Sequence, residues 1–425
     1  MITYMMISFL VLLLLGMPVA FAMGIAAALT VYQLESTSLL LIPQRLFMSL
    51  NSFPLLAIPF FVLAGELMNA GGITRRLVQF ATALLRHLRG SLAHVNVVTN
   101  MIMAGFSGSA TADCIAIGSV MIPAMKEEGY PPAFTAGLTA AASCIGPIIP
   151  PSIAMIIYGS ITGLSVGAMF LGGFIPGICI GLGLMFLVHV VYARKYSWPR
   201  GEKAGWSEIA SAARGASLAL LAPVIILGGI ITGVTTATEA GVVAVVYAFF
   251  IGVVVYKEIP IKKIPEILRN AAINTAVPVL IIACASIFGW VLARENFTGG
   301  VDDVLSSITT NPDISYFLII CMLLVVGCFV EGTAALLIFV PVLFPLGSKL
   351  GYDPIHFALV IIITILIGTI TPPVGLQLYI ASSISRVPIS EVVVWPFVAI
   401  MVAVLLIITY VPILVTFLPS LVFAK

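Results

Sequence analysis

Two stretches of the sequence share the pattern Gly-x-Ile-x-Pro-Pro, at residues 146–151 and 368–373, and each lies inside a long apolar run. A proline offers no backbone donor and disfavours helical geometry in the residue before it, so each pattern predicts a break in a helix. Backbone carbonyls freed by a break within a membrane need a partner, and a desolvated cation is a suitable one. The half-helix after the break has a positive N-terminal end that favours an anion. The two breaks therefore predict binding of a cation and of an anion.

Small residues and hydroxyl groups gather in two further segments, 106–113 and 331–334, which we expect to lie opposite the breaks. Hydroxyl and carbonyl oxygens are hard ligands, which suit Na⁺ better than a transition metal. The predicted Na⁺ ligands are Ser107, Gly108, Ser109, Gly146, Ile149, Gly332, Thr333, Gly368, Thr369 and Thr371. The residues predicted to contact an anionic substrate are Thr111, Asp113, Pro150, Ser152, Gly375 and Gln377. The alternative is that breaks and small residues only permit tight helix packing.

The composition places these segments in a lipid bilayer. Of the 425 residues, 61% are hydrophobic and 8% are charged, and the mean hydropathy is +1.20. Soluble domains carry about 25% charged residues, so we predict an all-α, polytopic membrane protein. The net charge of +2 gives no indication of nucleic acid as a partner. The predicted spans are 4–31, 52–71, 131–165, 168–193, 215–234, 236–256, 272–294, 355–385 and 391–420.

Basic residues predict the orientation of the chain, because Lys and Arg concentrate on the cytoplasmic side of a membrane. We place the N-terminus in the cytoplasm. All clusters of Lys and Arg then lie on the cytoplasmic side only if segments 91–126 and 314–348 each enter and leave the membrane on the same side. Each segment has two apolar arms of about 15 residues, which is short for a full crossing. We therefore predict two re-entrant hairpins, the first open to the cytoplasm and the second open to the outside.

The two halves of the sequence also match each other. Pro150 and Pro372 are 222 positions apart, and the same spacing relates the Gly-Tyr-x-Pro motifs at 129–132 and 351–354. Apolar composition alone would not produce such matches. Five predicted spans lie between the two hairpins, so the second copy is predicted to be inverted relative to the first. Inverted-topology repeats are typical of secondary transporters. The alternative is an old duplication without functional symmetry.

The repeat divides the chain into five predicted segments. They are N-terminal scaffold helices and an amphipathic arm at 1–90, a first transport unit of hairpin and broken helix at 91–165, scaffold helices, a second arm and linkers at 166–312, a second transport unit at 313–385, and a C-terminal helix at 386–425. The first arm, at 73–90, has apolar residues at helical spacing among four arginines. This pattern is typical of a helix in the cytoplasmic interface, and an ordinary surface helix is the alternative.

Four carboxylates lie in predicted membrane segments, namely Glu66, Asp113, Glu239 and Glu331. A charge there is costly unless it is paired or solvated, so each is a candidate functional residue. Asp113 and Glu331, at the predicted hairpin tips, either contact ions or cap the helix that follows. Glu66 and Glu239 lie on ordinary spans, where we expect them to fix helix packing.

Several longer stretches carry a more specific signal, namely 52–78, 87–98, 106–113 (FSGSATAD), 146–159 (GPIIPPSIAMIIYG) and 236–241 (TATEAG). Together they resemble the large membrane subunit of tripartite ATP-independent periplasmic (TRAP) transporters. The resemblance implies a transport channel in the bacterial inner membrane that works with a small four-helix membrane subunit and a periplasmic solute-binding protein. It also implies Na⁺-driven uptake of an organic-acid anion, such as a C4-dicarboxylate or sialic acid, by an elevator motion. We expect the small subunit to be a separate chain.

Two other functions fit parts of the sequence. A self-sufficient ion-coupled anion carrier without a binding protein, or a channel, would also use hairpins and broken helices. Residues 105–108 match the G-x-S-G pattern of rhomboid-type intramembrane serine proteases, which need a histidine base at the depth of the serine. The four histidines all lie near predicted membrane interfaces, so we expect the chain not to be an enzyme. The sequence has no Walker A motif, so drive by ATP is not expected.

Overall fold

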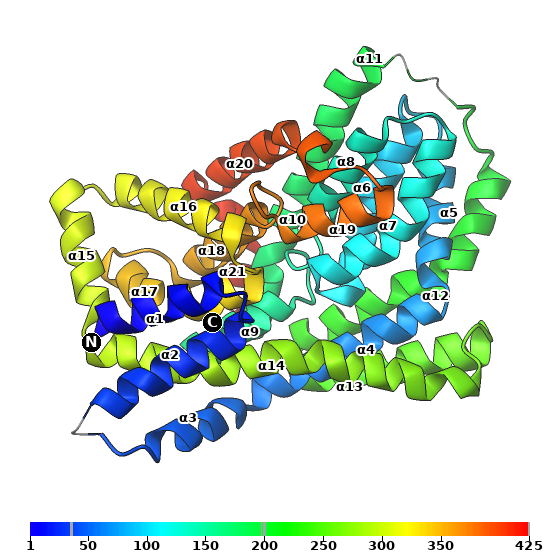
Figure 1. Ribbon diagram of the computed structural model, residues 1–425. Helices are drawn as coiled ribbons and strands as arrows, with labels where there is room; N and C mark the ends of the chain where they lie inside the picture. Colours follow the sequence, from blue (N-terminus) through cyan, green and yellow to red (C-terminus); the bar gives the residue numbers. More distant parts are fainter. Residues whose placement is uncertain (35–36, 197, 199–200, 424–425) are drawn as a thin grey trace.

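The chain is described by a computed structural model that covers residues 1–34, 37–196, 198 and 201–423, and these residues form helices and connecting turns without a β-strand (Figure 1). Among them, seven helices are long and apolar enough to cross a membrane, and a bent pair near the C-terminus makes an eighth if it is counted as one span. The polytopic, all-helical class predicted from the composition is therefore confirmed.

A frame of long helices runs along one side of the molecule in Figure 1. α4 packs against α13 and α14, and α14 also packs against α2 and α3. The bounds are α2 Val19–Gln33, α3 Leu41–Leu50, α4 Ala57–Ala70, α12 Trp206–Ile231, α13 Ala237–Phe249 and α14 Ile264–Arg294. Next to this frame lies α5 (Ile73–Leu85), the predicted amphipathic arm, which buries Leu77 and Ala81 and packs against α6 and α12. The frame and the arm are the part of the molecule against which the hairpins lie.

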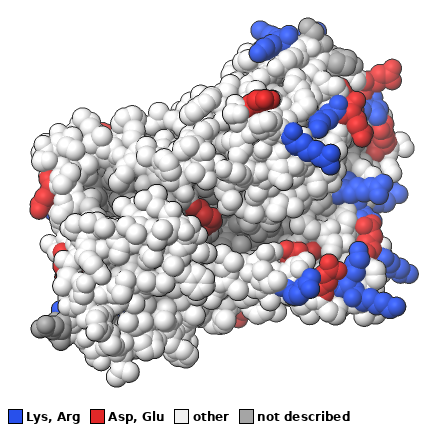
Figure 2. All heavy atoms as spheres, viewed as in Figure 1, with Lys and Arg blue, Asp and Glu red and all other residues white. Residues whose placement is uncertain are grey.

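Basic side chains lie mainly at one end of the molecule. Figure 2 shows Lys and Arg gathered at one end of the visible face, where α5 and α12 lie in Figure 1. Ion pairs at this end join the arm to other segments: Arg76 contacts Glu258 and Arg86 contacts Glu208, each at 2.6 Å. Under the rule that basic residues face the cytoplasm, this end is the predicted inner side.

The predicted span 4–31 is wrong. It divides into α1 (Ile2–Leu14) and α2, which pack against each other. Gly16 lies between them with a φ of 82°, a left-handed conformation that ends a helix. Pro18 follows, and its missing donor prevents the first helix from continuing. Gly16 and Pro18 therefore divide the apolar run into two helices, although the run is long enough for a single span.

The predicted span 391–420 is also not one straight helix. α20 (Trp395–Tyr410) and α21 (Ile413–Phe423) are bent by 52° relative to each other. Pro412 lies between them, and a proline removes a helical hydrogen bond at that position. The structure thus shows a bent pair where the sequence predicted one C-terminal helix.

Both predicted helical hairpins are present. α6 (Ser91–Ser107) pairs with α7 (Ala110–Glu127), and α16 (Pro312–Phe329) pairs with α17 (Gly332–Lys349). The arms contain 17, 18, 18 and 18 residues, so the predicted length of about 15 residues was wrong. Both arms of the second hairpin are long and apolar enough to cross a membrane. Arm length therefore does not decide whether the hairpins are re-entrant, and re-entry stays a prediction.

We expect the two ends of each hairpin to face the same side of the membrane, because re-entry brings both ends back to one surface. Cysteines that replace the exposed residues Arg89 and Glu128, in a cysteine-free background, should react with an impermeant thiol reagent only from the cytoplasm. Cysteines that replace the exposed residues Asp313 and Ser348 should react only from outside. Labelling of whole cells and of inverted vesicles measures both. Reaction from opposite sides within one pair would show two full spans.

The two predicted helix breaks are confirmed. The first lies between α8 (Pro132–Ser143) and α9 (Ile153–Thr162), and the second between α18 (Pro354–Gly368) and α19 (Leu376–Ser385). In both breaks the peptide bond between the two prolines is cis. Residues 144–152 of the first break are all buried. Unwound backbone at membrane depth is stable only where protein, water or a ligand surrounds it, and here protein does.

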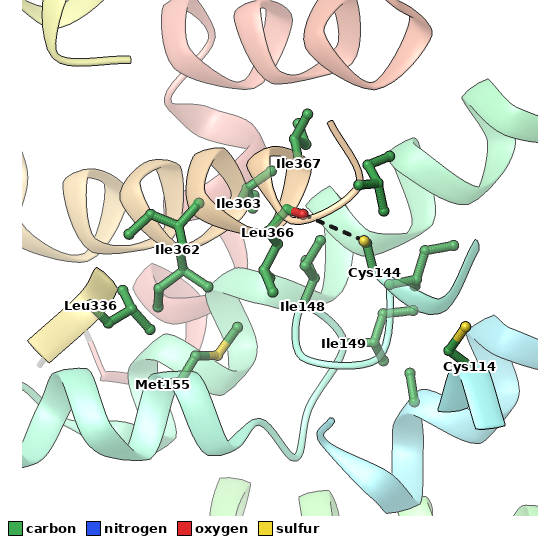
Figure 3. Packing of buried hydrophobic residues seen from close by; sticks show 14 of the residues in the cluster. Cys114, Cys144, Ile148, Ile149, Met155, Leu336, Ile362, Ile363, Leu366 and Ile367 are labelled. Carbon is green, nitrogen blue, oxygen red and sulfur yellow. Dashed lines mark hydrogen bonds between the residues drawn. The ribbon is translucent and has the colours of Figure 1, made fainter. Parts of the chain in front are cut away.

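The two copies of the repeat pack around each other. α7 lies against α19, and α17, which is the repeat equivalent of α7, lies against α9, the equivalent of α19. At the first break, Cys144 donates from Sγ to the carbonyl of Leu366 at the second break, 3.5 Å away (Figure 3). These two residues are separated by the repeat spacing of 222 positions. Each half-helix after a break therefore lies against the hairpin of the other copy.

Candidate functional site

A cavity of about 750 Å³ lies between the hairpin tips and the frame. Residues of α4, α5 and α14 line one side of it, and residues of α7, α17 and the two tips line the other. The cavity follows α7 as far as Ser119 and Val120 and reaches Arg75 in α5. It therefore extends from the tips toward the basic end of the molecule in Figure 2. A concave, mostly apolar site with a few polar groups is the usual form of a ligand-binding site.

The structure divides the predicted site residues into two groups. Those that line the cavity are Ser107, Gly108, Ser109, Thr111, Gly332, Thr333, Thr369 and Gln377. Those that do not line it are Asp113, Gly146, Ile149, Pro150, Ser152, Gly368, Thr371 and Gly375. Most of the second group lie in the two breaks, behind the tips. These residues of the unwound backbone thus lie outside the cavity lining, to which the first break contributes Pro147.

The first hairpin tip contacts the first break directly. The carbonyl of Gly108 accepts a hydrogen bond from the N–H of Ile153 at 3.4 Å. Gly108 has a φ of 60°, and a Cβ there would lie 2.7 Å from the carbonyl oxygen of Pro151, so this approach requires glycine. Ser152 caps α9 and donates its hydroxyl to the carbonyl of Pro147 at 2.5 Å. The tip and the break form one packed unit.

The second tip and the second break are joined in a similar way. The N–H of Gly375 donates to the carbonyl of Cys328 at 3.3 Å. Gly327 and Gly368 meet backbone to backbone, and a Cβ on Gly368 would lie 2.5 Å from the Cα of Gly327. No side chain fits between these two segments, so glycine at both positions allows the hairpin to lie on the break.

Polar side chains of the second break are oriented by the end of α18. Thr369 donates its hydroxyl to the carbonyl of Leu366 at 2.6 Å, and Thr371 donates to the carbonyl of Ile367 at 2.9 Å. Each hydroxyl oxygen keeps lone pairs for a further partner. Gln377 lines the cavity, and its Oε1 is buried without a hydrogen-bond partner among the described residues. A buried amide oxygen left without a partner is costly, so Gln377 is a candidate ligand.

Asp113 is the most unusual side chain of the site. It is fully buried, and within the described part of the chain neither carboxylate oxygen has a hydrogen-bond partner. A Cβ on Gly146 would overlap Oδ2 of Asp113, so the carboxylate is packed against the first break. Ser109 caps α7 instead, accepting from the N–H of Ala112 at 3.4 Å. The choice between ion contact and capping that the sequence left open is therefore resolved against capping for Asp113.

The environment of Asp113 fits a Na⁺ ion. A buried unpaired carboxylate is strongly unfavourable, and a cation removes that cost. The hydroxyl of Ser107 lies near the carboxylate, and the carbonyl oxygen of Ser143 lies with it beside Gly146; both are hard oxygen ligands. The described residues contain no group of three or more His, Cys, Asp or Glu side chains of the kind that holds a transition metal. The residues present at the first break therefore suit Na⁺, and Asp113 belongs with this break rather than with the cavity surface.

The other three intramembrane carboxylates already have partners. Glu331 caps α17 by accepting from the N–H of Ala334 at 3.0 Å, which is the role that Ser109 has in the first copy. Glu239 forms a capping box with Thr236 at the start of α13. Glu66 accepts from Nδ2 of Asn274 at 2.8 Å, which joins α4 to α14. The expected packing role of Glu66 agrees with this bond, although Glu66 also lines the cavity.

Sequence reasoning missed the frame side of the cavity. Asn69, Thr74, Arg75 and Asn274 line it together with Glu66. The sequence predicts Arg75 only as part of the interfacial arm. No local pattern predicts the contact between α14 and α4, because the two helices are about two hundred positions apart. The signal that was available is the presence of polar residues on otherwise apolar spans, which is costly without a functional reason.

The serine of the G-x-S-G pattern has no suitable base on its own helix. His94 and Ser107 both lie in α6, thirteen positions apart, which corresponds to about 20 Å along a helix. A general base must lie within hydrogen-bond distance of the serine. Instead of contacting His94, Ser107 lies at the tip that faces the first break.

Residues 6–414 match the protein family described as "Tripartite ATP-independent periplasmic transporter, DctM component". The chain is 40% identical over 377 residues to the sialic acid TRAP transporter large permease protein SiaM of Vibrio cholerae, with 89% of this chain and 88% of the relative covered. It is 36% identical over 430 residues to the C4-dicarboxylate TRAP transporter large permease protein DctM of Rhodobacter capsulatus, with 96% and 97% covered. It is 39% identical over 404 residues to the isethionate TRAP transporter permease protein DctMQ of Oleidesulfovibrio alaskensis, with 94% and 63% covered. The resemblance seen in the sequence is confirmed, and the chain belongs to the DctM family of TRAP transporter large permeases, which are multi-pass membrane transport proteins.

Proposed function

We propose that the chain is the channel-forming subunit of a Na⁺-coupled TRAP transporter in the bacterial inner membrane, and that it takes up an organic-acid anion of the C4-dicarboxylate or sialic-acid type. The single observation that carries the coupling is the buried, unpartnered carboxylate of Asp113 against the first break. The substrate class is supported by relatives named for sialic acid and for C4-dicarboxylates at 40% and 36% identity.

The first cation site uses Asp113 with the tip hydroxyls of Ser107 and Ser109 and the carbonyls near Gly146 and Ile149. When bound, Na⁺ supplies the positive charge that neutralises Asp113. The second site consists of Gly332, Thr333, Gly368, Thr369 and Thr371. It has no equivalent of the buried carboxylate, because Ala335 stands at the position equivalent to Asp113 and Glu331 at this tip caps α17. The two sites are therefore unequal, and the first has the stronger electrostatic attraction for a cation.

The anion site lies on the cavity side of the tips. Thr111 and Gln377 line the cavity and supply a hydroxyl and an amide. The half-helices α9 and α19 begin directly after the two breaks, and their positive ends favour a negative charge nearby. Cation sites beneath the tips and an anion site above them lie close together, so that occupation of one favours occupation of the other.

An elevator motion of an inverted repeat fits the packing. The reciprocal contacts of α7 with α19 and of α17 with α9 support two copies related by a pseudo-two-fold axis. The hairpins and the broken helices contact each other through backbone, and the cavity lies between the tips and part of α4 and α14, although α6 and α17 also pack against these two helices. A rigid body of hairpins and broken helices that slides past a fixed frame is the motion that this arrangement allows.

We expect transport to depend on two partners, a small four-helix membrane subunit and a periplasmic solute-binding protein. The chain alone in liposomes should show negligible uptake of labelled N-acetylneuraminate or succinate under an inward Na⁺ gradient, because substrate delivery falls to the binding protein. Addition of the cognate small subunit and the cognate ligand-loaded binding protein should restore uptake.

A choline gradient in place of Na⁺ is the control for coupling, and it should abolish uptake by the complete system. Strong Na⁺-driven uptake by the lone chain would contradict the proposal and would favour a self-sufficient anion carrier. Uptake by the complete system that is equal in Na⁺ and in choline would contradict Na⁺ coupling.

A further inference from the structure

Arg75 is the basic side chain among the residues that line the cavity. It lies in the first turn of α5 and is exposed. No ion pair or hydrogen bond within the described residues engages its guanidinium. A free positive charge thus faces a space whose walls are otherwise mostly apolar.

Two of the other three arginines of the arm are engaged elsewhere, and the third, Arg89, does not line the cavity. Arg76 forms an ion pair with Glu258 at 2.6 Å, and its guanidinium lies 3.8 Å from the centre of the Tyr256 ring. Arg86 forms an ion pair with Glu208 at 2.6 Å. These contacts attach the arm to neighbouring segments. Arg75 does not contribute to that attachment, and of the four arginines of the arm it is the one that lines the cavity.

The two carboxylates of the cavity do not offset Arg75 by direct contact. Glu66 is bonded to Asn274 at 2.8 Å, and Glu331 caps α17 at 3.0 Å. Close to Arg75 in the chain, Thr74 donates to Oδ1 of Asn69 at 2.9 Å, and both residues line the cavity. Oδ1 is occupied by this bond, so the amide group of Asn69 keeps its donors for another partner. Guanidinium and amide donors together form a surface that suits a carboxylate.

We propose that Arg75 binds a carboxylate of the transported anion at the mouth of the cavity near the basic end of the molecule. A planar guanidinium binds a carboxylate through two parallel hydrogen bonds, and a cavity with apolar walls focuses the field of its charge. Because Arg75 lies on the arm beside the frame and not on a hairpin, it meets the anion only while the cavity is open to this end. The identity of the anion rests on the proposed function, whereas the attraction of negative charge does not.

A reporter cysteine tests the charge directly. Ser119→Cys places a thiol in the cavity on α7, in a cysteine-free background. The reagent ratio is the rate of its reaction with an anionic methanethiosulfonate divided by the rate with a cationic one. This ratio should fall about tenfold in Arg75→Gln, which corresponds to about 1.4 kcal/mol. Arg75→Lys should keep most of the ratio. Arg89→Gln removes an exposed arginine from the end of the same arm but outside the cavity, and it should leave the ratio unchanged.

Exchange by the complete three-component system tests binding of the substrate. Arg75→Gln should raise about tenfold the concentration of N-acetylneuraminate or succinate on the cytoplasmic side that gives half-maximal exchange, with an unchanged Na⁺ dependence. If the parent protein transports neither anion with Na⁺, the proposed function fails and the reagent ratio still decides the role of Arg75. An unchanged reagent ratio overturns the proposal. A lowered reagent ratio together with an unchanged substrate concentration for half-maximal exchange would show that Arg75 attracts negative charge but does not bind the substrate.

Discussion

Replacement of Asp113 by asparagine should remove most of the Na⁺ dependence of transport. The carboxylate is fully buried and without a partner among the described residues, so a cation is its natural counter-charge. We expect the Na⁺ concentration for half-maximal uptake to rise at least about tenfold, or about 1.4 kcal/mol. Uptake by the reconstituted complex at a series of Na⁺ concentrations measures this.

Thermal unfolding gives a second measurement that does not depend on activity. Binding of Na⁺ to the folded state should raise the melting temperature of the parent chain in NaCl relative to choline chloride, and Asp113→Asn should lose this difference. In the absence of Na⁺ the variant should be the more stable of the two, because the unpaired buried charge is gone. Glu239→Gln, which changes a carboxylate of a capping box, is the matched control and should keep the Na⁺ effect. A full Na⁺ effect in Asp113→Asn would show that Asp113 is not at a cation site.

Gly368→Ala should destabilise the protein and abolish transport. The added methyl group would lie 2.5 Å from the Cα of Gly327 and 3.1 Å from the carbonyl oxygen of Leu324. Both are backbone atoms, so neither can rotate away, and overpacking of this kind costs about 1–3 kcal/mol. The hairpin and the break must separate, which also moves the hydroxyl groups of Thr369 and Thr371.

A melting curve of the purified chain measures the loss of stability, and uptake by the complete complex measures the loss of transport. Gly228→Ala is the control, because Gly228 lies within α12 and an added Cβ there would have no atom within 4 Å. We expect this variant to melt at or slightly above the parent temperature, since alanine favours a helix over glycine. Equal stability of Gly368→Ala and Gly228→Ala would mean that the contact between the second hairpin and its break is loose.

Local chemistry explains why the sequence predicted the breaks and the hairpin turns. At 146–151 and 368–373 the prolines forbid a continuous helix whatever surrounds them. Gly108, at the first tip, has a positive φ that favours glycine in any context. The same local effect at Gly16 and Pro18 was present in the sequence and was outweighed in the prediction by the length of the apolar run. The membrane class likewise follows from composition alone.

The packing of the helices and the roles of the carboxylates depend on residues that are distant in the sequence. α10 (Val166–Leu187) and α20 are apolar around their whole circumference, so periodicity does not indicate which face is buried or which helix it packs against. The roles of Asp113 and Glu331 could not be separated for the same reason: both lie near a hairpin tip, but only the folded chain places Glu331 at a helix cap and Asp113 against Gly146.

The sequence by itself determined the class of the protein, its repeat, its two helix breaks and its family, because these depend on composition, on proline and glycine, and on matches along the chain. Only the tertiary structure decided which surface faces the cavity. α4, α5 and α14 bring Glu66, Arg75 and Asn274 opposite the hairpin tips. In a membrane the apolar face of a helix is equally stable against lipid and against another helix. Which helices pack together therefore depends on close packing between specific surfaces, and no short stretch of sequence defines such a surface.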